Sequence, residues 1–338
     1  MCTALTYNSY FGRNFDYEFS YGEKIAFTPR NYIFNLRHEG EMKTHFAMLG
    51  VAFVYDNYPL YFDGMNEKGL GIAGLAFVGN ACYPKQLDAN KKNIALFEFI
   101  PYILGNYSSV KEVKEVLDDI NLIDTYFNGQ MPNSPLHWLI ADKEYSITVE
   151  CTKDGLHVYD NKIGVLTNNP IFPIQMFNLN NYAYLSDKQP ANTFNPDLEL
   201  NNYSRGMGGL GLPGDLSSQS RFVRASFIKS HIQSDDNENS NVSAFFHLLT
   251  SVEQQKGCCE VKENEYEYTI YSSCCSLEKG IYYYTSYNRR MINAIDMYRE
   301  DLDSSELKTY EILKEEEINF QNWQTKKVGR PTFCIKIA

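Results

Sequence analysis

The chain has 338 residues and a formal net charge of −11 from 31 basic and 42 acidic side chains. That length suits one large domain or two modest ones, each with a sizeable core. The negative charge argues against a nucleic-acid backbone or an anionic membrane surface as principal partner, because both attract basic patches. The first twenty residues lack the pattern of a secretory leader, and no apolar run approaches about 18 residues. We therefore expect a cytoplasmic protein.

The 8 cysteines include two adjacent pairs, Cys258-Cys259 and Cys274-Cys275. Zinc sites usually space their ligands two to four residues apart and recruit histidines at matching intervals, which this chain does not do. We expect reduced thiols that pack as small apolar residues, and neither a metal nor a cofactor.

Apolar periodicity predicts the secondary structure in chain order. Alternating residues predict strands over 24–54 and 64–79, and helical signals begin at about Ile94. A capping box at Ser109–Glu112 predicts an amphipathic helix that continues to Ile120. The remaining predicted elements are a hairpin over 146–167, helices over 221–233 and 242–252, and a second hairpin over 266–287.

Strands in this pattern flank a helical middle rather than alternate with helices. That order favours an α+β fold with largely antiparallel sheets over a doubly wound parallel sheet. No internal repeat or linker divides the chain.

The first candidate for chemistry is Cys2, which becomes the first residue if Met1 is removed. The α-amine would then share a residue with the thiol, and their ordinary pKa values of about 7.7–8.0 and about 8.5 let the amine take the thiol proton near neutral pH. Nearby, Arg13 could stabilise a thiolate and Asp16 could hold the amine. Taken alone, Cys2 is better explained as the second residue of an ordinary N-terminus.

Several motifs, in this order, resemble the choloylglycine hydrolase family, which comprises bile salt hydrolases and penicillin V acylases among the N-terminal nucleophile hydrolases. The motifs are Met1-Cys2-Thr3, Phe11-Gly12-Arg13-Asn14-Phe15-Asp16, Asn66-Glu67-Lys68-Gly69-Leu70, Leu166-Thr167-Asn168-Asn169-Pro170, and Leu212-Pro213-Gly214-Asp215 with Ser220-Arg221-Phe222.

The resemblance implies a four-layer αββα sandwich of two antiparallel sheets between helices, assembled as a homotetramer. It implies cleavage of an amide between an acyl group and an amino acid. The similar region is expected to form a single domain over residues 2–321, followed by a C-terminal tail of unknown role over 322–338.

The resemblance also implies catalytic roles, residue by residue. Cys2 would be the nucleophile, with its α-amine as proton acceptor held by Asp16. Arg13 and Arg221 would favour the charged sulfur, because guanidinium groups stay protonated. Asn168 would donate its side-chain amide to the oxyanion. Singly, Arg13 and Asp16 could be a surface pair, Arg221 the start of a helix and Asn168 a turn residue. Together and in this order, the residues favour catalysis.

Two features depart from the pattern of bile salt hydrolases. The segment Gly74-Leu75-Ala76-Phe77 has alanine where those enzymes typically have asparagine. The backbone N–H of Ala76 could still complete the oxyanion hole, but any contact of the missing amide is lost. The hairpin after Cys2 is short, since Tyr7–Phe11 spans a stretch that is usually longer, so its turn should be tight.

By the same resemblance, five apolar side chains fall on substrate-facing positions, and one arginine falls on the loop variant associated with taurine preference. An arginine fork suits a sulfonate, although aromatic residues are also common in cores and arginines in solvent-facing loops. The substrate-facing residues are Phe15, Tyr55, Phe62, Phe127 and Met131, and the arginine is Arg205 in Ser204-Arg205-Gly206.

The leading hypothesis is a bile salt hydrolase that takes a small-molecule substrate, a glycine or taurine conjugate, through a Cys2 acyl-thioester. The nearest alternative is a penicillin V acylase or another N-acyl amide acylase. Capture of the acyl group by another amine would make the protein a transferase. A different class of hypothesis is a catalytically impaired homologue that binds bile acids, suggested by Ala76 and the short hairpin.

Overall fold

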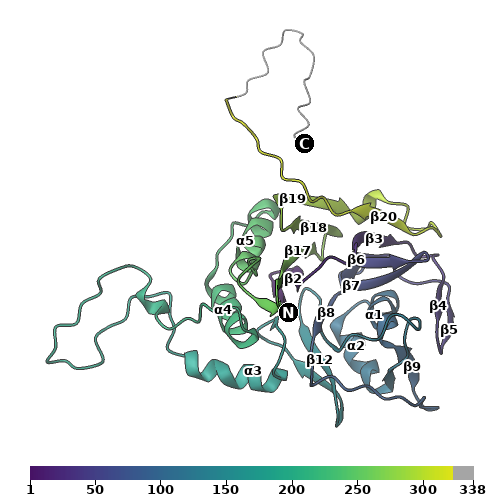
Figure 1. The fold of residues 1–338 in the computed structure, drawn as a ribbon, viewed down its shortest axis with the longest axis horizontal. Helices are drawn as coiled ribbons and strands as arrows, with labels where there is room; N and C mark the ends of the chain where they lie inside the picture. The colour runs from purple at the N-terminus through teal and green to yellow at the C-terminus, as the bar shows by residue number, and fades with distance from the viewer. Residues whose placement is uncertain (323–338) are drawn as a thin grey trace, which may run out of the picture.

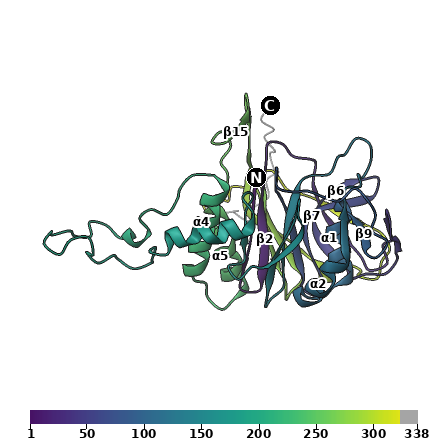
Figure 2. The same ribbon diagram turned by 90° about the horizontal axis from the view of Figure 1, so that it is seen from below.

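The computed structural model, which describes residues 1–322, has two β-sheets packed face to face with helices on both outer faces (Figures 1 and 2). Helices α4 (Ser218–His231) and α5 (Glu238–Thr250) cover one sheet, and α1 (Phe99–Asn106) and α2 (Val110–Val116) cover the other. The architecture is therefore the predicted α+β fold, a four-layer αββα sandwich.

The first sheet has six strands and is antiparallel throughout. The N-terminal hairpin lies inside this sheet, so both flanks of its first strand are paired. The strand order is β14 (Val165–Leu166), β1 (Cys2–Tyr7), β2 (Tyr10–Tyr17), β17 (Tyr268–Ser276), β18 (Ile281–Ser286) and β19 (Arg289–Asp296).

The second sheet has eight strands and is also antiparallel. Its order is β13 (Gly155–Asp160), β12 (Ser146–Thr152), β11 (Leu136–Ala141), β8 (Gly71–Ala76), β7 (Tyr58–Asn66), β6 (Met48–Tyr55), β3 (Lys24–Thr28) and β20 (Lys308–Glu311).

The smaller elements lie around these layers. The two-stranded pairs are β9 (Lys92–Ala95) with β10 (Ile120–Ile123), β4 (Phe34–Leu36) with β5 (Gly40–Met42), and β15 (Glu260–Lys262) with β16 (Glu265–Tyr266). The remaining helices are α3 (Phe172–Asn178) and the 3₁₀ turns η1 (Leu96–Glu98), η2 (Leu117–Asp119), η3 (Leu179–Tyr182), η4 (Met207–Gly209) and η5 (Met297–Arg299).

Strands of the second sheet are buried on both faces, which gives them two apolar sides. Leu75 and Leu139 belong to the core between the sheets, whereas Ile72 and Trp138 belong to the core under the helices. The Trp138 ring meets Phe99 of α1 edge-on at 4.7 Å between centroids. Alternation with a period of two residues thus builds one hydrophobic core on each side of this sheet.

Most predicted elements are confirmed. The strand over 146–152 has the predicted bounds, and its hairpin partner β13 follows Asp154. The partner ends at Asp160 rather than at the predicted Thr167, because Val165–Leu166 pairs with β1 in the other sheet. The second hairpin turns between Ser276 and Ile281, as predicted, and both long helices α4 and α5 are present. The N-terminal hairpin turns tightly at Asn8-Ser9, with Asn8 at a φ of 51°.

The helix predicted from the capping box is shorter than expected. Ser109 caps it, with its side chain accepting from the Glu112 N–H, but the helix ends at Val116. Ile120 lies in β10, which pairs in parallel with β9, so Ile94 is also in a strand rather than a helix. The Asn121 amide donates to Asn93 Oδ1 at 2.8 Å across this pair, a distant contact that helical periodicity does not report.

The chain beyond Asn322 lies outside the described residues. The expected tail over 322–338 therefore also lies outside them, apart from its first residue. We propose a single domain over 2–321, which is supported by the pairing of the late strand β20 with the early strand β3. Within residues 1–322, no helix is long and apolar enough to cross a membrane.

Candidate active site

Cys2 begins strand β1 between two paired strands, and its residue is only 5% exposed. Its main-chain N–H donates to Asn168 Oδ1 at 2.9 Å. The register explains this contact, because Ala4 pairs with Leu166 and continuing the antiparallel ladder by two residues places Asn168 opposite Cys2. The sulfur lies 3.9 Å from the Asp16 carbonyl oxygen on the other neighbouring strand.

Met1 places its α-amine beside the thiol. This amine lies 3.1 Å from the Asp16 carbonyl oxygen and pairs with the Glu267 carboxylate. Burial lowers the pKa of the amine, while the charges of Cys2 and Asp16 act against that shift. If Met1 is removed, the nitrogen of Cys2 becomes the α-amine, and it already has Asn168 Oδ1 as a hydrogen-bond acceptor.

Arg221, in the first turn of α4, is fully buried and binds three groups around the nucleophile. Nη1 donates to the Cys2 carbonyl oxygen at 2.7 Å and to Thr3 Oγ1 at 2.5 Å, and Nη2 donates to Asn168 Oδ1 at 2.7 Å. Burial lowers the pKa of Arg221, and Asp16 and Cys2 partly offset this effect. A cation near a helix N-terminus is unfavourable for the helix dipole. Arg221 therefore stabilises its partners in β1 and Asn168 rather than helix α4 itself.

Arg13 extends from β2 into the space between the sheets. Nη1 donates to the carbonyl oxygens of Gly74 at 2.5 Å and Phe62 at 3.2 Å, and the guanidinium lies 5.0 Å from the Phe15 ring centre. Burial disfavours its charge, but Cys2 and other acidic groups nearby raise the pKa of Arg13 overall. Buried Nη2 has no partner within residues 1–322, which leaves one donor group of this cation unused.

The Asp16 carboxyl group is fully buried. Oδ1 accepts from Thr269 Oγ1 at 2.5 Å, and Oδ2 has no partner within the described part of the chain. Burial raises the pKa of Asp16, and the Arg221 charge counteracts this shift. The contact with the Met1 amine comes from the carbonyl oxygen of Asp16 rather than from the carboxylate that we predicted to hold an amine.

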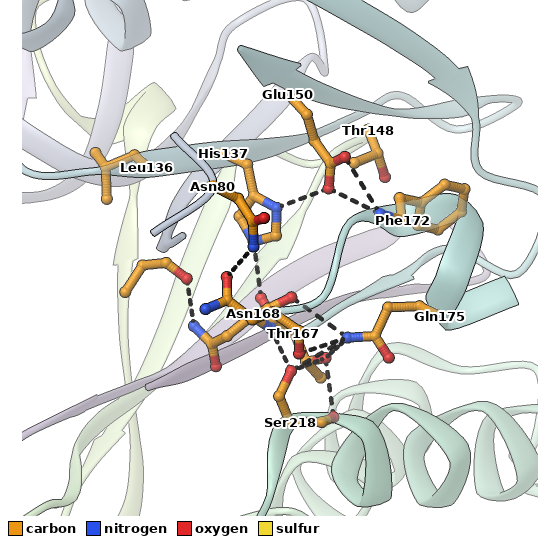
Figure 3. A network of polar contacts seen from close by, with 12 residues as sticks. Asn80, Leu136, His137, Thr148, Glu150, Thr167, Asn168, Phe172, Gln175 and Ser218 are labelled. Carbon is orange, nitrogen blue, oxygen red and sulfur yellow. Dashed lines mark hydrogen bonds and ion pairs between the residues drawn. The ribbon is translucent and has the colours of Figure 1, made fainter. Parts of the chain in front are cut away.

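Asn168 meets Ala76 directly, which brings together the two groups predicted for the oxyanion hole. Asn168 Nδ2 donates to the Ala76 carbonyl oxygen at 2.8 Å, and its main-chain N–H donates to Ser218 Oγ at 2.8 Å (Figure 3). An amide NH₂ carries two donors, so one N–H remains for a substrate oxygen.

Sequence reasoning missed a buried carboxylate behind Arg13. Asp63 accepts from the hydroxyls of Tyr271 and Tyr282, both at 2.5 Å, and burial raises its pKa while Arg13 opposes that shift. Tyr271 in turn stacks on Phe15 at 5.2 Å. A lone acidic residue inside an apolar strand was the available signal, since burying an unpaired charge is costly.

The predicted substrate side chains form two groups. Phe15 stacks on Phe62 at 4.9 Å next to Arg13. Tyr55 and Phe127 meet edge-on at 5.8 Å and line a cavity of about 680 Å³ that does not have Cys2 in its lining. Met131, partly buried, follows this second group in the chain.

Arg205 does not join either group. It is exposed on the long segment between α3 and α4, which projects away from the layers (Figure 1). The hydrogen bond from Ser186 N to Gly208 O, 3.0 Å long, closes the base of this projecting arm, which we define as residues 187–207. Arg205 therefore belongs to the arm, close in sequence to its base.

A family model described as linear amide C–N hydrolases, choloylglycine hydrolase family, matches residues 2–310. The chain belongs to the choloylglycine hydrolase family. The bile salt hydrolase/transferase of Lactiplantibacillus plantarum is 55% identical over 318 residues, which cover 93% of this chain and 98% of that protein. The bile salt hydrolase/transferase of Clostridium perfringens is 42% identical over 95% of this chain and 100% of that one.

Solved structures agree with this assignment. A conjugated bile acid hydrolase from Clostridium perfringens superposes with a TM-score of 0.89 at 42% identity, covering 95% of this chain and all of that one. A penicillin V acylase from Agrobacterium tumefaciens has a TM-score of 0.74 at 21% identity, over 92% and 91% of the two chains, and shares the fold. The chain is thus an amidohydrolase for linear amides, with the N-terminal nucleophile fold predicted from its motifs.

The contacts of Arg221 generate a testable prediction. Arg221→Lys keeps the charge but cannot reach Cys2 O, Thr3 Oγ1 and Asn168 Oδ1 with one ammonium group. We expect kcat to fall roughly 10²-fold, because the nucleophile and the oxyanion donor lose their common support. Steady-state amide hydrolysis measures this effect.

The control is Arg224→Lys, one turn further along α4, where the side chain binds the Ser251 and Pro213 carbonyl oxygens. It should stay close to wild-type kcat. Equal losses of kcat in both variants would show that the effect comes from a change in α4 as a whole rather than from the loss of the Arg221 contacts with Cys2, Thr3 and Asn168.

Proposed function

We propose that the protein is a bile salt hydrolase that cleaves the amide of glycine- or taurine-conjugated bile acids through a Cys2 acyl-thioester, after removal of Met1. The arrangement of Cys2 with Arg13, Arg221 and Asn168 carries the proposal. It is supported by relatives at 55% and 42% identity that are named bile salt hydrolase/transferase.

The reaction begins with proton transfer from the Cys2 thiol to its own α-amine. The thiolate attacks the substrate carbonyl carbon, and the negative charge moves to the carbonyl oxygen. The free N–H of Asn168 and the backbone N–H of Ala76 receive this oxyanion. When the C–N bond breaks, the α-ammonium returns the proton to the departing amine, and an acyl-thioester remains on Cys2.

The second half of the reaction releases the bile acid. The neutral α-amine takes a proton from water, whose oxygen attacks the thioester carbonyl carbon. Collapse of this intermediate breaks the C–S bond and regenerates the thiol. In both halves, Arg13 stabilises the sulfur anion, because its guanidinium is held between the sheets with one donor unused. Asp16 would support the amine of Cys2, because its carbonyl oxygen, which accepts from the Met1 amine at 3.1 Å, becomes free for another donor once Met1 is removed.

The acyl group would lie against the aromatic side chains. Phe15 and Phe62 are nearest to the catalytic side chains, since the Arg13 guanidinium lies over Phe15 and contacts the Phe62 carbonyl oxygen. Tyr55, Phe127 and Met131 would bind the distal part of the steroid. A cavity of about 680 Å³ beside Tyr55 and Phe127 has space for a rigid apolar ligand.

The projecting arm supports a homotetramer. It exposes large apolar side chains, including Phe194 at 85% and Tyr203 at 81% exposure, which burial against another subunit would stabilise. Arg205 lies on the same arm, so we propose that it binds the anionic end of a leaving group held by a neighbouring subunit. This arrangement would retain the predicted contact of Arg205 with taurine.

A second activity has a specific observation in its favour. The relatives from Lactiplantibacillus plantarum and Clostridium perfringens carry the name hydrolase/transferase. An amine that attacks the acyl-thioester in place of water would form a new amide by the same chemistry. Penicillin V acylase activity has weaker support, a relative that is 28% identical over half of this chain.

The direct test measures release of taurine and glycine from taurocholate and glycocholate, with penicillin V in parallel. Wild type should cleave the bile salts, and Cys2→Ala should be inactive because no other side chain supplies a nucleophile joined to an α-amine. Cleavage of penicillin V alone would assign the chain to the acylases. Binding of bile acids without cleavage, by a chain shown to lack Met1, would contradict catalysis.

Arg205→Ala tests the arm. We expect the ratio of taurine to glycine release to fall several-fold with little change in glycine release, because a sulfonate loses a bidentate partner. Sedimentation of the same variant should still give a tetramer. An unchanged ratio would remove Arg205 from the substrate site, and a monomeric wild type that keeps the same preference would contradict action across subunits.

A further inference from the structure

A fully buried acid–base pair lies behind the site and has no role in the reaction described above. His137 comes from β11 and Glu150 from β12, and both side chains have 0% exposure. His137 Nδ1 lies 3.1 Å from Glu150 Oε1 (Figure 3). Buried polar groups are stable only when their donors and acceptors are hydrogen-bonded. The hydrogen-bond partners of this pair therefore indicate which segments it positions.

The second ring nitrogen points to the segment that carries Asn168. Nε2 lies 3.0 Å from the Thr167 carbonyl oxygen. The Thr167 carbonyl oxygen can only accept a hydrogen bond, so Nε2 carries a hydrogen and donates it to that oxygen. Glu150 contacts the other ring nitrogen and so orients the His137 ring toward Thr167.

The peptide bond between Thr167 and Asn168 is held at both ends. Its carbonyl oxygen accepts from His137, and its N–H donates to Ser218 Oγ at 2.8 Å. Gln175 Nε2 lies 3.3 Å from the next carbonyl oxygen, that of Asn168. These contacts fix the plane from which the Asn168 side chain extends toward Cys2 and Ala76.

The same imidazole also contacts the Ala76 segment. The Phe77 ring stacks on His137 at 4.2 Å with an interplanar angle of 9°. Phe77 directly follows Ala76, whose carbonyl oxygen accepts from Asn168 Nδ2. One ring therefore contacts the strand end that carries Ala76 and the strand end that carries Asn168.

Glu150 is held independently of His137. Its two carboxylate oxygens accept from the N–H of Phe172, the first residue of α3, at 3.0 and 3.2 Å. Gln175, on the same helix, binds the Asn168 segment. Glu150 thus joins His137 to α3. His137 and Gln175 both contact the Thr167–Asn168 segment, which connects the two ends of this network (Figure 3).

We propose that His137, oriented by Glu150, is a positioning residue that sets the separation between Asn168 and Ala76 and so aligns the two oxyanion donors. The inference rests on the proposed reaction, in which these two groups receive the oxyanion. Its physical basis is the sensitivity of such donors to geometry, since a displacement of about 1 Å can cost roughly 10² in rate.

Two isosteric variants separate the two ring contacts. His137→Gln places an amide nitrogen near the position of Nε2 and keeps the donor to Thr167, whereas His137→Asn places one near Nδ1 and keeps only the contact with Glu150. Both remove the ring and its stacking on Phe77. We expect kcat for bile-salt cleavage to fall roughly 10- to 100-fold in His137→Asn. In His137→Gln the loss should be several times smaller, with KM little changed in both.

Controls account for folding and for loss of a histidine in general. Thermal unfolding should place both variants at similar midpoints, because both lose the same ring. His157 lies on the neighbouring edge strand β13 and forms a hydrogen bond with Thr152 Oγ1. The variant His157→Asn should leave kcat unchanged. Similar kcat values in the Asn and Gln variants at position 137, or a change in KM alone, would overturn the proposal.

Crystal structures of the two variants give a readout that needs no substrate. The hydrogen bond from Asn168 Nδ2 to Ala76 O should persist in His137→Gln and be lost or lengthened in His137→Asn. If wild type fails to cleave bile salts, the proposed function fails while this structural comparison still tests the positioning role. An intact bond in both variants would overturn that role whatever the substrate.

Discussion

The site depends on one buried cation. Arg221 binds Cys2 O, Thr3 Oγ1 and Asn168 Oδ1, so a single guanidinium joins the first strand to the segment after β14 and to helix α4. Removing such a group from water costs several kcal/mol unless its donors are satisfied, and here the partners belong to the reacting region. Folding therefore completes the site, because the core that buries Arg221 forms only when these three segments meet.

The sandwich makes this meeting possible. β1 is paired on both sides, which brings Asn168 opposite Cys2 through β14 and Asp16 close to the sulfur through β2. The second sheet supplies Ala76 from the end of β8, and its carbonyl oxygen accepts from Asn168 across the gap between the sheets. The nucleophile, the cations and the proposed oxyanion donors thus come from separate segments, which the two sheets and α4 hold at fixed separations.

Local patterns predicted the parts of this structure that local forces determine. Alternation identified the strand 146–152 and its hairpin, and capping identified the start of α2 at Ser109. The strand at Ile120 was missed because it forms by parallel pairing with β9, a distant partner that helical periodicity cannot report. Cys2, Arg13 and Asp16 lie in one N-terminal stretch, where their chemistry already linked them, whereas Asn168 and Arg221 are far away in sequence and only the family motifs could join them to the site. For His137 and Asp63 the available signal was a single polar residue in an apolar strand, and such a residue shows its partners only after folding.

The central claim is that an acyl group passes through Cys2 of a chain that has lost Met1. Mixing the protein with taurocholate, quenching in acid within the first turnover and measuring the mass of the N-terminal peptide tests it most directly. The account predicts a peptide that begins at Cys2 and carries one cholyl group bound as a thioester, which hydroxylamine removes. An unmodified peptide during rapid turnover, or a cholyl group on a different residue, would contradict it.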